Sequence, residues 1–386
     1  MNILILSHGY RSSNIAGGPQ QDIRDFFLNK VNKIDYIVHP FTFANFRQSL
    51  MVQYENGKII DKLLSYKIRG PEWLQYIGHF FITIYFLLRD RRQYDICFAL
   101  DDLCFIPVLL YKKLGRINTL IYYSIDYTNR RFKNPILNRI YFLADSISCK
   151  YSDINWTITK HAVSAREKNG MNVDACAPFL EVPIGIHRKE IQLARIETID
   201  RFHLVFVGSL SEKQGLQLVI KSLRNIISIF PKIHLTVIGT GDYETTLKLL
   251  VKKEHLEHKV IFKGFITNHK EVEKILTVAG VGLAPYKPDP TSFTYYADPG
   301  KIKLYLGCGL PVITTDVPVI SKTVKNANAG VVIPYTERGI SLAITKLLRN
   351  KQSFEVYRKA AIKLSENYDV ENILNSSITK SLHRKA

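Results

Sequence analysis

Short apolar runs separated by amphipathic stretches set the pattern of this chain. The first run covers residues 2–6, and comparable runs follow through the amino-terminal half, at 34–38, 94–100, 119–124 and 154–159. Continuous apolar runs of this length, unlike alternating ones, predict strands buried on both faces of a parallel sheet. Helical stretches lie between them, the first at about residues 20–30. The pattern therefore predicts an α/β fold with a parallel sheet.

The same pattern restarts in the second half, after the segment Pro183-Ile184-Gly185-Ile186-His187 and a charged stretch to Arg201. Strands are expected there at 203–208, 233–238, 260–262, 281–284, 312–315 and 330–333. We predict two Rossmann-like parallel-sheet domains, residues 1–187 and 202–360, followed by a helical tail over 361–386. Ligands of open parallel sheets bind beyond the carboxyl ends of the strands. Two such domains facing each other are thus expected to hold a ligand in the cleft between them.

The composition agrees with a folded two-domain protein. The chain has 386 residues, of which 46% are hydrophobic, and a mean hydropathy of -0.03. Its five cysteines form no CxxC pair, so neither a disulfide framework nor a zinc site is expected. Met1 leads into the first apolar run without a basic segment. No secretory signal is therefore expected, and the cytoplasm is the expected location.

The net charge of the chain and one long apolar run indicate what the protein can bind. The net charge is +19, and the basic excess is spread over both halves. No nucleic-acid motif accompanies it, which favours an anionic membrane surface over nucleic acid, with plain solubility charge as the alternative. The longest apolar run, Phe80–Leu88, is far shorter than the ~20 residues of a membrane span. It predicts a buried helix, and an interfacial helix flanked by arginines is the alternative.

The stretch 295–313 carries the most informative motif. A polar loop, Tyr295-Tyr296-Ala297-Asp298-Pro299-Gly300-Lys301, precedes a short helical segment, a Gly-Leu-Pro turn and a β-rich run. A loop that opens a helix can hold a phosphate group, because its backbone N–H groups and the positive helix end point at the ligand. Three further motifs follow predicted strands: Gly208-Ser209 with Lys213, Gly239-Thr240-Gly241, and Lys263-Gly264-Phe265.

In this order, the motifs resemble those of the family-4 (group 1) nucleotide-sugar glycosyltransferases of the GT-B fold. The resemblance implies that the carboxy-terminal domain binds a nucleotide-sugar donor through Gly208, Ser209, Lys213, Gly239, Gly241, Gly264, Phe265, Tyr296 and Lys301. Lys301 and Lys213 are expected to neutralise the diphosphate, because Ser209 and Gln214 stand where the family has Arg and Lys. A solvated Lys213, tight turns at Gly239 and Gly241, and a core phenylalanine at Phe265 are the alternatives.

Two family glutamates have no counterpart here. Asp298 lies two residues beyond the first glutamate position, at Tyr296, and is expected to replace its contact with the hydroxyls of the donor sugar. An Asp-Pro turn is the alternative interpretation of Asp298. Leu304 stands where the second glutamate would hold the ribose, so ribose recognition must differ from the family pattern.

The amino-terminal half supplies candidates for the acceptor side. Gly17 and Gly18 resemble the family's glycine-rich loop after the first strand, and a plain turn is the alternative. Asp126 follows a strand and is the candidate base for an acceptor hydroxyl, unless an ion pair with the nearby arginines occupies it. Asp101 and Asp102 end another strand and are the alternative bases. His8 also ends a strand and is expected to be structural.

The resemblance implies an enzyme that transfers a sugar from a nucleotide-diphosphate sugar, by preference a UDP-sugar, to a saccharide or lipid-linked acceptor of a cell-surface glycan. Neither a metal ion nor a cofactor besides the donor is expected, because no cluster has metal-ligand spacing. The enzyme is expected in the cytoplasm, with a peripheral site on the inner face of the membrane. Retention and inversion at the anomeric carbon both remain open. A sugar-nucleotide epimerase of the same fold and a non-catalytic partner subunit of a transferase are the alternative functions.

Overall fold

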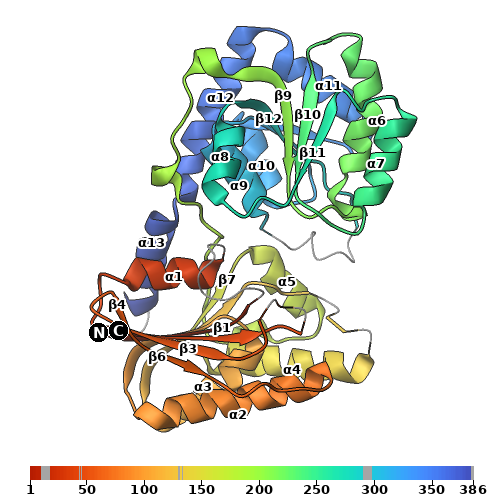
Figure 1. The fold of residues 1–386 in the computed structure, drawn as a ribbon. Coiled ribbons are helices and arrows are strands. Elements are labelled where there is room, and N and C mark those ends of the chain that lie inside the picture. The colour runs from red at the N-terminus through yellow and green to blue at the C-terminus, as the bar shows by residue number, and fades with distance from the viewer. Residues whose placement is uncertain are drawn as a thin grey trace. The chain divides into compact units, whose positions relative to one another are not determined.

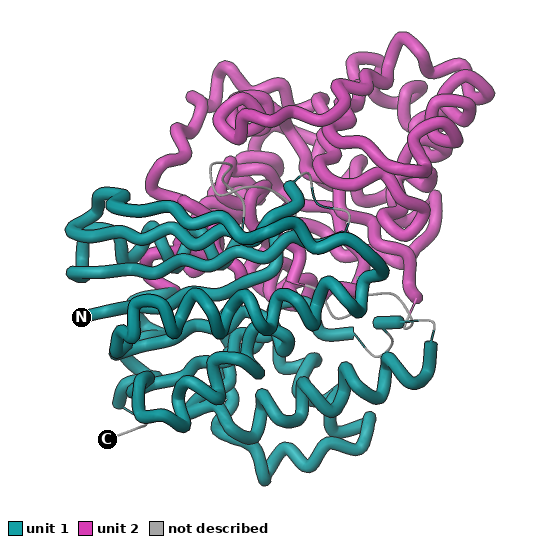
Figure 2. The backbone as a smooth tube through the Cα atoms, turned by 60° about the horizontal axis from the view of Figure 1, so that its bottom comes forward, with its two compact units in different colours: residues 1–183, 374–386 teal, residues 184–373 magenta. Residues whose placement is uncertain are grey.

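The chain folds into two compact units. The computed structural model describes residues 1–9, 18–42, 44, 46–128, 131–132, 134–289 and 298–383. Unit 1 comprises Met1–Pro183 and Leu374–Ala386, and unit 2 comprises Ile184–Ile373 (Figure 2). The last helix, α13 (Val370–His383), therefore contributes its final residues to unit 1, where Trp156 Nε1 donates a 2.9 Å hydrogen bond to Ser381 Oγ.

Unit 1 is built on an eight-stranded sheet in the order β4-β3-β2-β1-β5-β6-β7-β8. Its strands are β1 (Asn2–Gly9), β2 (Lys33–Pro40), β3 (Leu50–Glu55), β4 (Lys58–Leu64), β5 (Tyr94–Ala99), β6 (Ile117–Ser124), β7 (Ile154–Thr157) and β8 (Phe179–Glu181). The predicted strands are confirmed and pair with one another in parallel, whereas β3 pairs antiparallel with both β2 and β4. The β3–β4 hairpin was not predicted. It turns at Asn56-Gly57, whose φ angles of 48° and 77° suit a tight hairpin turn.

Helices cover the sheet of unit 1: α1 (Pro19–Phe27), α2 (Glu72–Asp90), α3 (Asp102–Lys113), α4 (Pro135–Tyr151) and α5 (Lys160–Lys168). Helices α2, α3 and α4 form one layer against one face of the sheet (Figure 1). Phe86 of α2, Phe105 of α3 and Cys149 of α4 pack with Leu6 and Leu120 of the strands in one core. None of the helices among the described residues combines the length and apolarity needed to cross a membrane.

Unit 2 has a six-stranded sheet in the order β11-β10-β9-β12-β13-β14, and its strand pairs are parallel. The strands are β9 (Asp200–Val207), β10 (His234–Ile238), β11 (Val260–Gly264), β12 (Ala279–Ala284), β13 (Val312–Thr315) and β14 (Gly330–Ile333). All six predicted strands are confirmed. The strand order is that of the doubly wound dinucleotide-binding sheet, in which the direction of winding reverses between β9 and β12. That reversal marks the expected ligand position.

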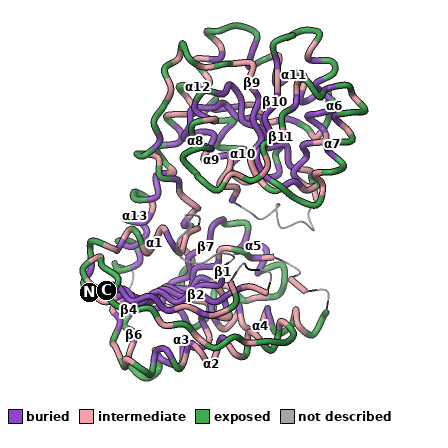
Figure 3. The backbone as a smooth tube through the Cα atoms, viewed as in Figure 1, coloured by how far each residue is buried: buried purple, intermediate pink, exposed green. Residues whose placement is uncertain are grey.

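Two helical layers enclose the second sheet. One face packs α6 (Leu216–Ile227), α7 (Glu244–Lys253) and α11 (Glu337–Leu348), and the other packs α8 (His269–Thr277), α9 (Gly300–Gly307), α10 (Ile320–Asn326) and α12 (Lys351–Ser365). Neighbouring residues of β9 supply both cores, because Phe206 points to the first layer and Val205 to the second. The strands of both sheets are largely buried, as the purple colour in Figure 3 shows.

Candidate functional site

Lys301 occupies the point of unit 2 where the winding of the sheet reverses. It lies in the first turn of α9, and its Nζ atom is 4.2 Å from the ring centroid of Phe206 at the end of β9. The same atom is 5.2 Å from the ring centroid of Tyr286, which follows β12. It donates a 2.6 Å hydrogen bond to Gln214 Oε1. The ammonium therefore stands beyond the carboxyl ends of the two strands between which ligands of this sheet bind.

The charge of Lys301 lacks a counter-ion within the described part of the chain. Lys301 takes part in no ion pair there, and burial lowers its pKa to about 7. Burying a cation without an anion is costly, and an arriving anion removes the cost by restoring the protonated form. The backbone N–H groups at the start of α9 lie in the same loop and also favour negative charge. The arrangement suits a phosphate-bearing ligand.

Glycine at position 208 leaves room for this ammonium. Gly208 has a φ of 140°, and a Cβ atom there would lie 2.8 Å from Lys301 Nζ. Close backbone approach also explains two of the other predicted glycines. A Cβ on Gly239 would lie 2.0 Å from the Gly208 carbonyl oxygen, and one on Gly241 would lie 2.3 Å from that of Leu210. These contacts account for Gly239 and Gly241 as packing positions, whereas direct ligand contact stays a prediction.

The remaining predicted donor residues differ in exposure. Ser209 and Phe265 are exposed, and Gly264 has a φ of 68° with open space where a Cβ would be. Lys213 Nζ lies 3.7 Å from Asp289 Oδ2, so this lysine has an acidic neighbour. It is the buried Gln214 that contacts Lys301. The sequence signal for Gln214 was its place where the family has a lysine.

Asp298 is held in an ion pair with Lys303. Its Oδ2 atom accepts hydrogen bonds from the Lys303 ammonium and, at 2.8 Å, from the Ile184 N–H group. Lys303 Nζ also donates to the Ile184 carbonyl oxygen at 2.6 Å, and both charged side chains are almost fully buried. This pair fastens the start of the α9 loop to Ile184, and the expected contact of Asp298 with sugar hydroxyls stays a prediction. Tyr296 and Gly17 lie outside the described residues.

Unit 1 contains a cavity of about 210 Å³ at the carboxyl ends of β1, β5 and β6. Asp101 and Asp102 line it after β5, and Asp126 lines it after β6. Gly18, which precedes α1, and Arg131 complete this part of the wall. The cavity lies where the winding of the first sheet reverses, between β1 and β5. The structure therefore brings Gly18 and all three candidate bases together in one place.

The pKa values of the three carboxyl groups of this cavity are shifted in different directions. Asp101 accepts hydrogen bonds from Cys104 N at 2.7 Å and from His8 N and Nδ1 at 3.0 and 2.9 Å. Although burial opposes it, the charge of His8 and these bonds hold the pKa of Asp101 below its ordinary value. Burial and the charge of Asp101 raise the pKa of Asp102 to about 7, and Asp102 Oδ2 is buried without a hydrogen-bond partner among the described residues.

Asp126 is the second carboxyl group with a raised pKa. Desolvation by the surrounding protein raises the pKa of Asp126, although part of this residue is exposed to solvent, and the positive charge of Arg131 opposes the rise. A carboxyl group can take a proton from a hydroxyl group most effectively when its pKa approaches the working pH. The raised pKa values of Asp102 and Asp126 thus suit a general base. Asp101, in contrast, is hydrogen-bonded to His8 and to the start of α3.

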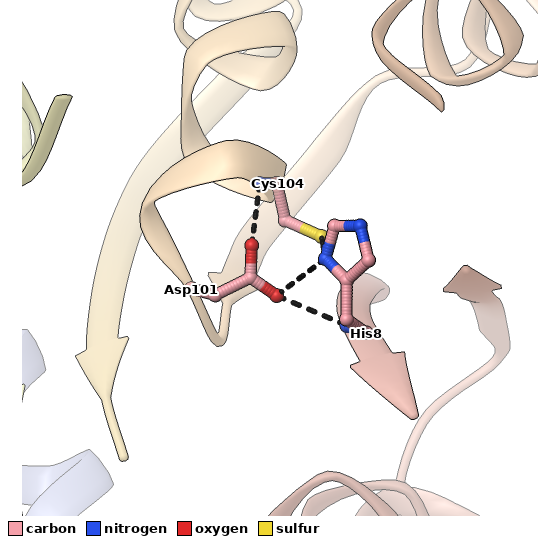
Figure 4. A group of neighbouring side chains, drawn as sticks. All are labelled: His8, Asp101 and Cys104. Carbon is pink, nitrogen blue, oxygen red and sulfur yellow. Dashed lines mark hydrogen bonds and ion pairs between the residues drawn. The ribbon is translucent and has the colours of Figure 1, made fainter. Parts of the chain in front are cut away.

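His8 and Asp101, which line this cavity, form a close cluster with Cys104 (Figure 4). One potential ligand atom from each lies within 4.8 Å of the others. Burial raises the pKa of the Cys104 thiol well above its usual value, which opposes the thiolate form that metals bind. His8 Nε2 also lies 3.2 Å from His79 Nδ1. We interpret the cluster as a set of hydrogen bonds that connects β1 to α3, which agrees with the structural role expected for His8. The absence of a metal site stays a prediction.

The carboxy-terminal half of the chain has recognisable relatives. Residues 190–364 match the family described as glycosyl transferases group 1. The chain is 26% identical over 247 residues to the chitobiosyldiphosphodolichol beta-mannosyltransferase of Candida albicans, covering 58% of this chain and 53% of that protein. The chain thus spans about half the length of the curated relatives it matches.

Two solved structures share the architecture of the whole chain. Sucrose-phosphate synthase from Thermosynechococcus elongatus superposes with a TM-score of 0.73, and HepE from Anabaena in complex with UDP superposes with a TM-score of 0.70. Each is 14% identical, and each comparison covers 100% of both chains. At this identity the likeness shows the fold alone. The expected GT-B fold and the resemblance to group 1 glycosyltransferases are confirmed.

Proposed function

We propose that this chain, a glycosyltransferase of the GT-B fold whose residues 190–364 match the group 1 family, transfers a sugar from a nucleoside-diphosphate sugar to a saccharide or lipid-linked acceptor. The observation that carries the proposal is the position of Lys301. Its ammonium lies at the reversal point of the second sheet, above Phe206 and next to Gln214. A buried cation at that point, without a counter-ion among the described residues, needs an anion, and a diphosphate supplies one.

Lys301 would act on the leaving group. As the bond between the anomeric carbon and the diphosphate breaks, negative charge grows on the departing phosphate oxygen. A fixed ammonium in a site of low dielectric stabilises that charge without reorganisation. The N–H groups at the start of α9 would add to it. Because these groups supply the positive charge, we propose that transfer proceeds without a divalent metal ion.

We propose a UDP-sugar as the donor. The support is an analogy of fold, since HepE from Anabaena was solved with UDP and with UDP-glucose. Phe265 lies exposed after β11, where a ring can pack on a nucleobase. The analogy does not identify the sugar that is transferred. The test below therefore compares donors that differ in both the sugar and the nucleobase.

The acceptor hydroxyl would bind in the cavity of unit 1. If transfer inverts the anomeric carbon, Asp126 or Asp102 takes the proton of that hydroxyl group, since both pKa values are raised. If transfer retains it, the donor phosphate assists and neither carboxyl group is essential. Because the chain is strongly basic, we further propose that the enzyme acts at the cytoplasmic face of an anionic membrane. We propose that the product is a cell-surface glycan.

The test is acceptor-dependent release of a nucleoside diphosphate. The full chain is incubated with UDP-glucose, GDP-mannose or a dTDP-sugar, and with extracted lipid-linked saccharides, in EDTA. We expect release from one donor that rises with acceptor and is lost in Lys301→Met. Folded protein that binds none of these donors would support the non-catalytic alternative instead.

A further inference from the structure

The outward face of α2 is apolar along its whole length. Its large exposed side chains are Trp73, Leu74, Ile77, Phe81, Tyr85 and Leu88, and Trp73, Phe81 and Tyr85 are 54%, 64% and 60% exposed. No charged residue interrupts this face between Glu72 and Arg89. Glu72 itself is only partly accessible and accepts a 2.6 Å hydrogen bond from Tyr76 OH. The prediction of a buried helix here is wrong for this face.

The inward face of α2 is apolar as well. Phe86 and Leu87 are almost completely buried against the sheet of unit 1. A helix on the surface of a water-soluble domain normally pairs an apolar inward face with a polar outward one. Apolar side chains on both faces, spread over several turns, mark a surface that lacks its partner.

The same property continues over the neighbouring helices. Helix α3 packs between α2 and α4, and the three form one layer (Figure 1). Ile136, Ile140 and Leu143 of α4 are 66%, 56% and 62% exposed, and their spacing puts them on one side of that helix. Leu110 and Leu114 add two exposed leucines at the end of α3. We call the exposed apolar residues of α2, α3 and α4 the three-helix face.

The exposed charged residues that α2, α3 and α4 carry are all basic, and Arg89 lies 3.9 Å from one exposed acidic residue, Asp61 of β4. The exposed charged residues on α2, α3 and α4, and just after α2, are Arg89, Arg91, Lys113, Arg139 and Lys150. The acidic residues of these helices, Glu72, Asp90, Asp102 and Asp145, are partly or fully buried. Apolar side chains on helices whose own exposed charges are all basic suit a surface with negative headgroups and an apolar interior.

We propose that the three-helix face docks on an anionic lipid bilayer. Trp73, Phe81 and Tyr85 would enter the boundary between headgroups and acyl chains, where amphipathic aromatic rings are stable. Arg89, Arg139 and their neighbours would contact lipid phosphates. The inference deepens the membrane part of the proposed function by assigning it to a defined surface of unit 1. Its test contains no nucleotide sugar, so its failure and the failure of the transferase proposal are distinguishable.

The first test is co-sedimentation of the full chain with phosphatidylcholine vesicles, with and without phosphatidylglycerol. We expect binding only to the anionic vesicles, weakening as salt rises. The double variant Phe81→Ser/Tyr85→Ser should lose at least tenfold in partition coefficient. The matched control is Leu249→Ser/Leu342→Ser, which removes two leucines that are 64% and 61% exposed on unit 2 and should bind as the wild type does. Thermal unfolding verifies that both variants fold.

The second test uses intrinsic fluorescence. The chain has two tryptophans, and Trp156 is fully buried while Trp73 is 54% exposed. We expect anionic vesicles to shift the emission to shorter wavelength, and Trp73→Phe to abolish the shift. An unchanged emission, or a lack of binding at low salt, would overturn the proposal. So would a dimer in sedimentation equilibrium that Phe81→Ser/Tyr85→Ser dissolves, because the face would then belong to a second copy of the chain.

Discussion

Lys301 donates a 2.6 Å hydrogen bond to Gln214, and this neutral amide is its hydrogen-bond partner in the described part of the chain. An amide oxygen orients an ammonium group but does not cancel its charge. Burial therefore lowers the pKa of Lys301 to about 7. The pair joins the loop after β9 to the start of α9, and it leaves one positive charge for a ligand to neutralise.

The first prediction concerns the pH dependence of nucleotide binding. A bound diphosphate raises the pKa of Lys301, so binding above pH 7 takes up a proton. We expect the affinity for the preferred nucleoside diphosphate to fall by up to about tenfold per pH unit between pH 7 and 9. Isothermal titration in buffers of different ionisation enthalpy measures this uptake. Lys301→Arg should remove the dependence, because arginine stays charged, and a flat wild-type profile would contradict the assignment.

The same pKa has a consequence for stability. Because the pKa of Lys301 in the folded chain lies below its unfolded value, the unfolded chain binds the additional proton between about pH 7 and 10. The unliganded protein should therefore lose stability as the pH falls through this range. Lys301→Met should raise the Tm at pH 7.5 by about 2–4 °C for each kcal/mol regained, whereas a lower Tm would show that Lys301 holds the fold together.

The second prediction concerns the space between Gly208 and the Lys301 ammonium. A Cβ atom at this position would press on Lys301 Nζ at 2.8 Å, and the φ of 140° disfavours any side chain. Gly208→Ala should therefore lower nucleotide affinity at least tenfold. Gly300→Ala is the matched control, because a Cβ there meets nothing within 4 Å. Equal affinities of the two variants would argue against a ligand at Gly208.

The third prediction separates structure from catalysis at Asp298. Asp298→Ala removes the carboxylate that forms an ion pair with the buried Lys303 ammonium, which should cost about 3–5 kcal/mol of unfolding free energy. Asp298→Ala/Lys303→Met removes both charges and should recover most of that loss. Denaturant unfolding and transfer assays on the two variants decide the role. A stable double variant that transfers no sugar would support the predicted contact with donor hydroxyls, and full activity would exclude it.

The fourth prediction concerns the carboxyl groups in the cavity of unit 1. The pKa of Asp102 is raised to about 7, so the wild type should lose stability as the pH rises from about 4 to 7, because this group ionises in the unfolded chain while it stays protonated in the folded one. Asp102→Asn should remove that loss and raise the Tm at pH 7.5 by about 2–4 °C for each kcal/mol regained. A Tm that falls on this substitution would show that the carboxylate has a partner.

Activity of the same variants addresses the mechanism. Near-complete loss of transfer in Asp126→Asn or Asp102→Asn, with donor binding intact, would identify the base of an inverting reaction. Mild loss in both would favour retention assisted by the donor phosphate. The anomeric configuration of the product, read by NMR, is the independent check.

Most strands that are buried on both faces were predictable, although β3, which is also largely buried, was not predicted. Residues 3–6 and 204–207 are continuous apolar runs, and a parallel sheet with helices on both faces accounts for them. The β4 strand escaped prediction because its residues are almost all exposed and form no such run. Its signal was the Asn56-Gly57 turn. The α2 helix was expected to be buried because both of its faces are apolar. The sequence does not show whether the outward face contacts protein, lipid or water.

The candidate sites divide in the same way. Lys301 and Gly208 were identified because short motifs with a known geometry contain them. Gln214 was not predicted as a site residue, because its contact with the site is a hydrogen bond from Lys301, which lies far along the chain. Nor does sequence distinguish Asp101 from Asp102. Only the fold shows that the former pairs with His8 and caps α3, while the latter keeps an unpartnered oxygen atom in the cavity.

The most direct test of the central claim, a nucleoside-diphosphate site at Lys301, is thermal unfolding with added ligand. UDP, GDP and dTDP are each titrated into the wild type and Lys301→Met at pH 7, since a ligand that binds only the folded state raises the Tm. We predict that one of the three, UDP by preference, raises the Tm of the wild type by several degrees and leaves that of Lys301→Met unchanged. No shift with any of them, or equal shifts in both proteins, would contradict the claim.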